Sequence, residues 1–138
     1  MDDVSLIEIA LQARLKAYAP YSHFLVGAAL LADDGTVIDG CNIENASYGA
    51  TNCAERCAFF KAVSEGITKF RSIAICGGDE KESELSGYAY PCGICRQVMR
   101  EFCDENEFTV IIARSTSDYK KFTLKELLPY SFGPDDLK

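Results

Sequence analysis

The order of the predicted helices and strands restricts the fold of this chain more than any other feature. Strands are predicted at residues 25–31, 36–41, 72–76 and 108–113, and helices at 4–18, 53–65 and 91–104, with a short helix after Thr123. After an opening helix and hairpin, helix and strand therefore alternate along the chain. Such an alternation indicates an α/β fold, in which helices cover the faces of a mixed sheet.

Local signals place the ends of several elements. Apolar residues recur at helical spacing from Val4 through Leu15 to Tyr18, which predicts an amphipathic helix that ends before Pro20. Asp34-Gly35 predicts the turn of the hairpin. Thr123-Leu124-Lys125-Glu126 has the pattern of a capping box and predicts a last short helix.

Size and composition limit the class of protein. The 138 residues fit one domain, residues 1–138, and 48% of them are hydrophobic, enough for a folded core. No apolar run approaches the roughly 20 residues that a membrane span needs. The start Met-Asp-Asp is acidic, whereas a secretory signal starts with basic residues. We therefore expect a cytoplasmic protein that does not bind membranes.

The charge argues against a nucleic-acid partner. Lys and Arg number 14 and Asp and Glu 21, which gives a net charge of −7. A protein that binds polynucleotides needs clustered cations to displace counterions. The only basic pair here is Lys120-Lys121. We therefore expect a small-molecule ligand.

The chain contains seven cysteines, a high and odd number. In a cytoplasmic protein, such a count favours metal binding or catalysis over a disulfide framework. Cys41, Cys76 and Cys103 lie within apolar stretches, and we interpret them as small buried hydrophobic residues. The remaining cysteines cluster in two short motifs.

The two motifs stand at the starts of two predicted helices. Cys53-Ala54-Glu55 begins one helix, and Pro91-Cys92-Gly93-Ile94-Cys95 begins another. A helix N-terminus has free N–H groups and partial positive charge, which favour a cysteine thiolate. Cys92 and Cys95 share one face of a helical turn, so they can bind one metal ion together. We predict that Cys53 is the third ligand if the two helix starts converge at one edge of the sheet.

Three protein ligands would leave one position of a tetrahedral zinc ion open for water. Zinc makes such a water acidic enough to act as hydroxide near neutral pH. Glu55 is two residues from Cys53, and both side chains can point off the helix start into a common pocket. We therefore predict that Glu55 is the proton shuttle.

Other interpretations of the cysteines are open at this point. Cys57 lies four residues after Cys53, so these two with Cys92 and Cys95 could form a closed structural zinc site. The Cys-x-x-Cys pair could also be a redox pair. The single histidine, His23, is interpreted as a hydrogen-bonding loop residue.

The motifs resemble those of the cytidine deaminase family, in its small homotetrameric branch. Besides the two cysteine motifs, the chain resembles this family over nearly its whole length, in the order Tyr21-Ser22-His23-Phe24, Val26-Gly27-Ala28-Ala29, Asn42-Ile43-Glu44-Asn45-Ala46-Ser47, Cys95-Arg96-Gln97 and Leu127-Leu128-Pro129. Zinc deaminases combine a Cys-x-x-Cys after proline with a glutamate that is not a ligand. The resemblance implies a three-layer α/β/α fold with a mixed five-stranded sheet and one zinc ion per subunit of a homotetramer.

The resemblance also implies roles in substrate binding. Phe24, Asn42 and Glu44 correspond to nucleoside-binding residues. Ala54 corresponds to the residue whose backbone N–H meets the pyrimidine carbonyl. Tyr90 occupies the position whose backbone carbonyl receives the amino group, where the family often has a small hydroxyl residue.

Further implied roles concern the metal and the subunits. Arg56 corresponds to a residue that hydrogen-bonds the ligand thiolates and offsets their negative charge. Phe132 corresponds to an aromatic residue that completes the site of a neighbouring subunit. Cys57 departs from the small residue that is commoner at its position.

The expected function is hydrolytic deamination of free cytidine and 2′-deoxycytidine to uridine and 2′-deoxyuridine, in pyrimidine salvage. In this mechanism, zinc-bound hydroxide attacks C4 and Glu55 moves the protons. The alternatives are a deaminase of a cytosine-containing antibiotic such as blasticidin S, a structural zinc domain without turnover and, third, a polynucleotide editor. The segment from Asn42 to Ser47 speaks against the first, and the net charge against the last.

Overall fold

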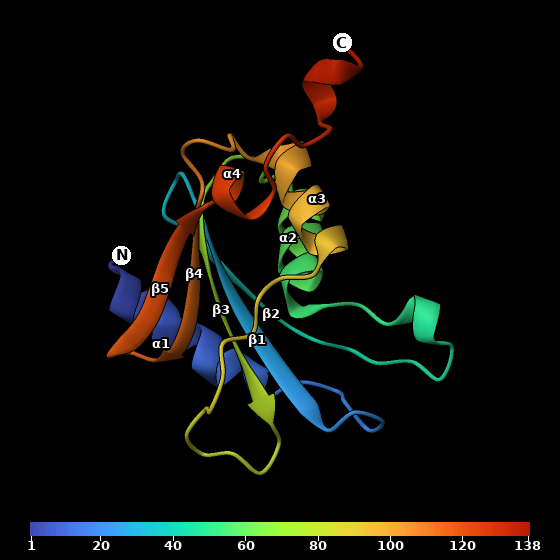
Figure 1. Cartoon of the computed structure of the whole chain (residues 1–138), viewed down its shortest axis with the longest axis vertical. Coiled ribbons are helices and arrows are strands. Elements are labelled where there is room, and N and C mark those ends of the chain that lie inside the picture. The colour runs from blue at the N-terminus through green and yellow to red at the C-terminus, as the bar shows by residue number, and fades with distance from the viewer.

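Five strands form one mixed sheet in the computed structural model, which describes residues 1–138 (Figure 1). They are β1 (Phe24–Ala32), β2 (Val37–Cys41), β3 (Phe70–Asp79), β4 (Thr109–Ser115) and β5 (Asp118–Thr123). The order across the sheet is β2-β1-β3-β4-β5. Only β3 and β4 pair in parallel, and the other neighbours are antiparallel.

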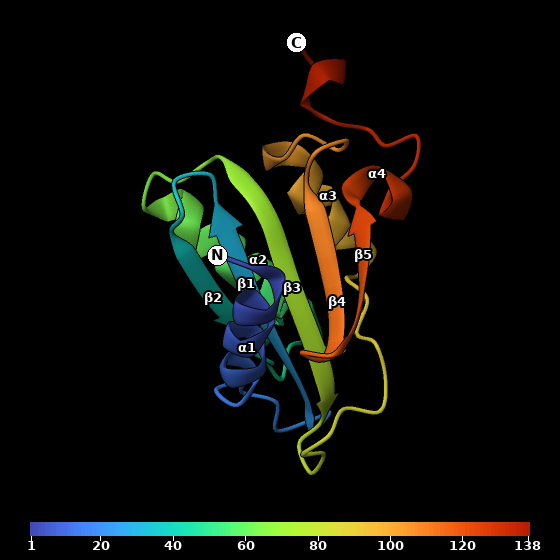
Figure 2. The same cartoon turned by 90° about the vertical axis from the view of Figure 1, so that its left-hand side faces the viewer.

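The helices lie on both faces of this sheet. They are α1 (Asp3–Arg14), α2 (Ala54–Ser64), α3 (Gly93–Phe102) and α4 (Leu124–Leu127), with 3-10 turns η1 (Tyr48–Ala50) and η2 (Pro134–Asp136). Helix α1 covers one face, while α2 and α3 lie side by side on the other (Figures 1 and 2). The predicted three-layer α/β/α fold with a five-stranded sheet is therefore confirmed. None of the helices is long and apolar enough to cross a membrane.

Alternating residues of the strands supply a separate core to each face. On β1, Ala28 and Leu30 face α2 and α3, whereas Ala29 and Leu31 face α1. This alternation follows from the two-residue repeat of a strand, and here both faces carry apolar residues. Helix α2 contributes Phe59, which is fully buried. The sheet thus holds α2 and α3 against one common surface.

The first helix is shorter than the apolar spacing predicts. It ends at Arg14, and Leu15 and Tyr18 are exposed rather than buried. The backbone of Tyr18 pairs with another segment: its N–H donates to the Asn42 carbonyl at 3.0 Å, and its carbonyl accepts from the Glu44 N–H at 2.8 Å. Tertiary pairing therefore takes the backbone groups that a longer helix would use.

At the ends and edges of the sheet, the structure differs from the sequence prediction in three smaller points and agrees with it in one. The residue patterns located four strands and missed β5, a mostly polar edge strand that pairs only with β4. Cys41 is half-buried rather than buried, because it ends the opposite edge strand, β2. Strand β3 continues to Asp79, beyond the predicted strand end at Cys76. The predicted capping box at Thr123 is confirmed, since its side chain and that of Glu126 bond each other's backbone N–H.

Gly40 of β2 lets α2 lie very close to the sheet. A Cβ at this position would be 2.4 Å from the carbonyl oxygen of Ala54 and 2.7 Å from the backbone nitrogen of Ala58. Because both contacts are backbone atoms, we expect Gly40→Ala to displace the start of α2 and to lower the free energy of unfolding by about 2 kcal/mol. Gly49→Ala is the control, because nothing lies within 4 Å of its Cβ. Urea unfolding of both variants measures the difference, and equal stabilities would contradict this packing.

Candidate metal and substrate site

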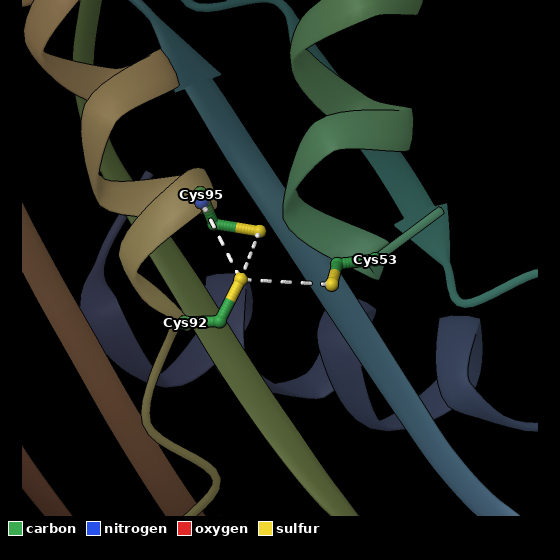
Figure 3. Close-up of side chains that lie close together, drawn as sticks. All are labelled: Cys53, Cys92 and Cys95. Atoms are coloured by element: carbon green, nitrogen blue, oxygen red, sulfur yellow. Dashed lines mark hydrogen bonds between the residues drawn. The ribbon is translucent and has the colours of Figure 1, made fainter. Parts of the chain in front are cut away.

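The three predicted ligands meet where two helices begin. Cys53 is the N-cap of α2, Cys92 is the N-cap of α3, and Cys95 follows in the first turn of α3. Their Sγ atoms lie within 4.8 Å of one another. The distance from Cys92 Sγ is 3.9 Å to Cys53 Sγ and 3.5 Å to Cys95 Sγ, and the three side chains point toward a common centre (Figure 3).

The surroundings of Cys53 favour its thiolate. A hydrogen bond from the Cys95 thiol and the guanidinium of Arg56 lower the pKa of Cys53 to about 5. Arg56 Nη2 donates to Cys53 Sγ at 3.2 Å, as the resemblance implies for this residue. Conversely, the hydrogen bond to Cys53 and burial raise the pKa of Cys95. Cys53 is therefore the cysteine of the cluster whose thiolate its surroundings favour most.

Cys57 lies outside this cluster. Only Cys53, Cys92 and Cys95 bring their ligand atoms together, although Cys57 is one helical turn from Cys53. Burial, followed by the nearby Cys41, raises the pKa of the Cys57 thiol. The structure therefore gives no support to the closed site of four thiolates.

Glu55 is buried at the same helix start. Glu55 is only 4% exposed, yet it lines the same cavity as Cys53. Burial raises the pKa of Glu55 to about 7, and the neighbouring Cys53 thiolate adds to the shift. A carboxyl group with such a pKa can both hold and release a proton near neutral pH.

The cavity beside the cysteines has a volume of about 350 Å³. Its lining is mainly apolar, with a few polar groups, as is typical of small-molecule sites. Its twelve lining residues are Phe24, Val26, Asn42, Thr51, Asn52, Cys53, Ala54, Glu55, Ile75, Ala89, Tyr90 and Cys92. The structure thus brings Phe24, Asn42, Ala54 and Tyr90 together with the cysteines and Glu55.

The two predicted polar substrate contacts differ in position. Asn42 lines the cavity, and its amide already bonds β1: Oδ1 accepts from the Val26 N–H and Nδ2 donates to the Phe24 carbonyl, both at 2.8 Å. Glu44 lines an adjoining hollow, where its carboxylate accepts from the N–H groups of Tyr21 and Ser22 at 3.0 and 3.1 Å. The Ser22 hydroxyl also donates to Glu44 Oε2, so these bonds leave one N–H of Asn42 and one lone pair of Glu44 free for a ligand.

Two other predicted residues lie at the margins. The ring of Tyr90 lies 6.1 Å from that of Phe122 on β5 and is 46% exposed. Phe132 is 60% exposed and does not line the cavity of its own chain. Its carbonyl accepts from Gln97 Nε2 at 2.8 Å, and the C-terminal segment beyond projects from the body of the protein (Figures 1 and 2).

Five lining residues were not predicted: Val26, Thr51, Asn52, Ile75 and Ala89. Their sequence signals are weak, because Val26 and Ile75 look like ordinary strand residues. Asn52 directly precedes Cys53 and Ala89 directly precedes Tyr90, but being next to a site residue does not by itself predict that a side chain lines the cavity. The Oδ1 atom of Asn52 is buried without a hydrogen-bond partner.

A larger hollow, of about 700 Å³, lies away from the cysteines, between the end of α1 and the β4–β5 turn. Its Arg14 is committed to the backbone, since the guanidinium donates to the carbonyls of Gly78 and Asp79 at 3.2 and 3.1 Å. The hollow contains none of the clustered cysteines and no predicted site residue, so it gives no reason to move the site.

The residues at the cysteine cluster fit a zinc ion. Sulfur ligands at about 2.3 Å from a tetrahedral zinc ion lie about 3.8 Å apart, and the measured Sγ separations of 3.5 and 3.9 Å are close to this. Thiolates are ligands that zinc prefers. The Arg56 contact to Cys53 supplies the positive charge that three thiolates require.

Comparisons with known proteins agree with the fold and the cluster. The sequence model of the cytidine and deoxycytidylate deaminase zinc-binding region matches residues 1–111. A cytidine deaminase of Sporosarcina psychrophila is 48% identical over 99% of this chain and 96% of its own length. One of Halalkalibacterium halodurans is 49% identical over 99% and 98%.

Solved structures lead to the same family. The crystal structure of cytidine deaminase from Burkholderia pseudomallei has a TM-score of 0.86 and 46% identity, covering 96% of this chain and all of that one. The enzyme from Mycobacterium tuberculosis has a TM-score of 0.81 and 38% identity over 96% and 98%. The chain therefore belongs to the cytidine and deoxycytidylate deaminase family of zinc-dependent enzymes.

Proposed function

We propose that this protein hydrolyses free cytidine and 2′-deoxycytidine to uridine and 2′-deoxyuridine, with release of ammonia, in pyrimidine salvage. One observation carries the proposal: a buried carboxyl group, Glu55, lines the same cavity as two cysteines of the metal cluster. The substrate follows from relatives at 48 and 49% identity that are named cytidine deaminases. The antibiotic deaminase and the structural zinc domain have no such support.

Cys53, Cys92 and Cys95 would hold one zinc ion per subunit. When bound, zinc supplies Lewis acidity, which lowers the pKa of a water molecule to near 7. Glu55 lines the same cavity as Cys53 and Cys92, so its carboxyl group would lie close enough to exchange a proton with such a water. Arg56 keeps Cys53 in its thiolate form and offsets the charge of the three sulfurs.

Glu55 would move every proton of the reaction. It takes one from the attacking water and gives it to N3 of cytosine as the new bond forms at C4. It then transfers the second proton to the amino group, which leaves as ammonia. The carboxyl is suited to both tasks because its pKa of about 7 lies close to neutral pH.

The cavity wall would orient the base and the sugar. Phe24 offers an apolar face to the pyrimidine, and Ala54, the first residue of α2, offers a free backbone N–H to its carbonyl. The backbone carbonyl of Tyr90 receives the amino group. Asn42 and Glu44 bond the ribose hydroxyls through the donor and acceptor capacity that their bonds to β1 and the Tyr21 loop leave free.

The size and charge of the substrate give a direct test. We expect cytidine and 2′-deoxycytidine to be deaminated, while cytidine monophosphate and single-stranded DNA are not, because Glu44 and the net charge of −7 repel phosphates. The fall in ultraviolet absorbance of each substrate, with zinc content measured on the same sample, checks this. Efficient deamination of either phosphorylated substrate would contradict the proposed specificity.

The assembly is proposed to be a homotetramer in which Phe132 completes the site of a neighbour. Phe132→Ala should therefore raise KM for cytidine about tenfold while the zinc content stays normal, since an aromatic contact of this kind is worth about 1–2 kcal/mol. Light scattering at the assay concentration supplies the oligomeric state. A fully active monomer would rule out this arrangement.

Two further expectations stay predictions. The cytoplasmic location follows from the sequence composition and calls for fractionation of cells. A single domain over residues 1–138 is supported by one sheet that carries both apolar clusters. One cooperative unfolding transition by two probes would agree with it.

A further inference from the structure

The segment between β3 and α3 forms part of the cavity without regular structure of its own. Ala89, Tyr90 and Cys92 line the cavity, yet no backbone–backbone hydrogen bond involves residues 83–91. Ala89 also fits closely against β3, because a Cβ on Gly77 would lie 2.9 Å from the Cβ of Ala89. Side chains must therefore fix the path of this part of the wall.

Arg96 Nε donates to the Pro91 carbonyl at 2.7 Å at the end of this segment, and Tyr88 makes three contacts in its middle. Its hydroxyl donates to Asp118 Oδ1 at 2.5 Å, at the start of β5. Lys120 Nζ lies 4.4 Å from the centre of its ring, and Arg114 Cζ lies 5.6 Å from it. Both distances suit cation–π contacts. The ring is half-buried against the core below α2 and α3.

The partners of Tyr88 are themselves connected. Arg114 Nη1 lies 3.3 Å from Asp118 Oδ2, and Arg114 Nε donates to the carbonyl of Leu85 at 3.2 Å. Lys120 Nζ is 3.5 Å from the hydroxyl of Tyr90. The β4–β5 hairpin thus contacts the segment at residues 85, 88 and 90. Its charged side chains, Arg114, Asp118 and Lys120, surround the phenol of Tyr88.

We infer that Tyr88 is a positioning residue, which holds Ala89 and Tyr90 of the cavity wall against the β4–β5 hairpin. The inference rests on the proposed function for its effect on turnover. Tyr88 touches neither the cavity nor the cysteines, but Ala89 and Tyr90 follow it directly, and Cys92 is four residues away. A shift of Tyr88 therefore moves the Tyr90 carbonyl, and displacements of about 1 Å can cost about 10²-fold in rate.

The test compares two substitutions of Tyr88 with a matched control. Tyr88→Leu removes ring and hydroxyl and should lower kcat/KM for cytidine about 10²-fold, whereas Tyr88→Phe should lower it about tenfold. Zinc content should stay normal in both, because Cys53 and Cys95 belong to the starts of α2 and α3, and the Arg96 N–H holds Cys92 to α3 by a 3.0 Å bond to its carbonyl. Tyr119→Phe is the control, because it removes the same hydroxyl from the residue next to Asp118. Tyr119 packs against the apolar cluster on the α1 face of the sheet, so this variant should behave as the wild type.

Two further measurements separate positioning from general stability. Cleavage after Glu82 or Glu84 by a glutamate-specific protease should become at least about tenfold faster in Tyr88→Phe, while α2 and α3 keep their hydrogen-exchange protection. In a double-mutant cycle, Asp118→Ala should add little to the loss that Tyr88→Phe already causes. If Tyr88→Leu does not fold, Tyr88→Phe still decides the question.

Wild-type turnover and wild-type protease cleavage in Tyr88→Phe, additive effects in the cycle, or an equal loss in Tyr119→Phe would each overturn the inference. Absence of cytidine deamination by the wild-type protein would instead overturn the proposed function. The proteolysis experiment needs no substrate, so it tests how firmly the segment is held in either case.

Discussion

Glu55→Gln is expected to lose about 10²–10⁴-fold in kcat while it keeps its zinc and its fold. This range is the usual contribution of a general acid–base group, and here one carboxyl group serves several proton transfers. Glutamine has nearly the same shape and can keep hydrogen bonds, but it cannot accept and return a proton. Steady-state deamination of cytidine, with zinc measured on the same preparation, gives the result.

A matched control lies on the same helix. Glu65 caps the far end of α2 and is exposed, so Glu65→Gln changes the same charge without touching the cavity. It should keep wild-type kcat and KM. Near-normal turnover in Glu55→Gln, or an equal loss in both variants, would remove Glu55 from the mechanism.

The sequence predicted the fold where local signals and tertiary packing agree. The apolar run of β1 predicts a strand because both of its faces are buried. The capping box at Thr123 predicts a helix start because its hydrogen bonds are all local. The end of α1 was missed because the backbone of Tyr18 pairs with residues 42–44, which are distant in sequence. Strand β5 was missed because an edge strand needs little apolar surface.

The same division applies to the site. Cys53, Cys92, Cys95 and Glu55 stand in compact motifs, so spacing and helix starts were sufficient to group them. The contributions of Ile75, Ala89 and Thr51 to the cavity depend on how three distant segments fold together. The adjoining hollow around Glu44, separate from the main cavity, likewise follows from the Tyr21 loop, whose N–H groups bond its carboxylate.

Replacing any one of the three clustered cysteines by serine is expected to abolish both zinc binding and deamination. Each sulfur is one of only three protein ligands, and a serine hydroxyl is a far poorer ligand for zinc at neutral pH. Zinc per subunit, measured after dialysis, and turnover of cytidine should fall together in Cys53→Ser, Cys92→Ser and Cys95→Ser. A variant that loses activity but keeps its full zinc content would show that the replaced cysteine is not a zinc ligand.

Cys57→Ser is the matched control, and it decides between an open and a closed metal site. A fourth thiolate would fill the position that water needs, and Glu55 would then have no water to act on. Cys57 lies one turn farther along α2, away from the N–H groups at the helix start that favour thiolates, and its Sγ is not part of the cluster. We therefore expect Cys57→Ser to keep its zinc and most of its activity, and X-ray absorption to find three sulfurs and one lighter atom around the metal. Four sulfurs, with loss of zinc in Cys57→Ser, would mean that the metal site is closed and that its zinc has a structural role.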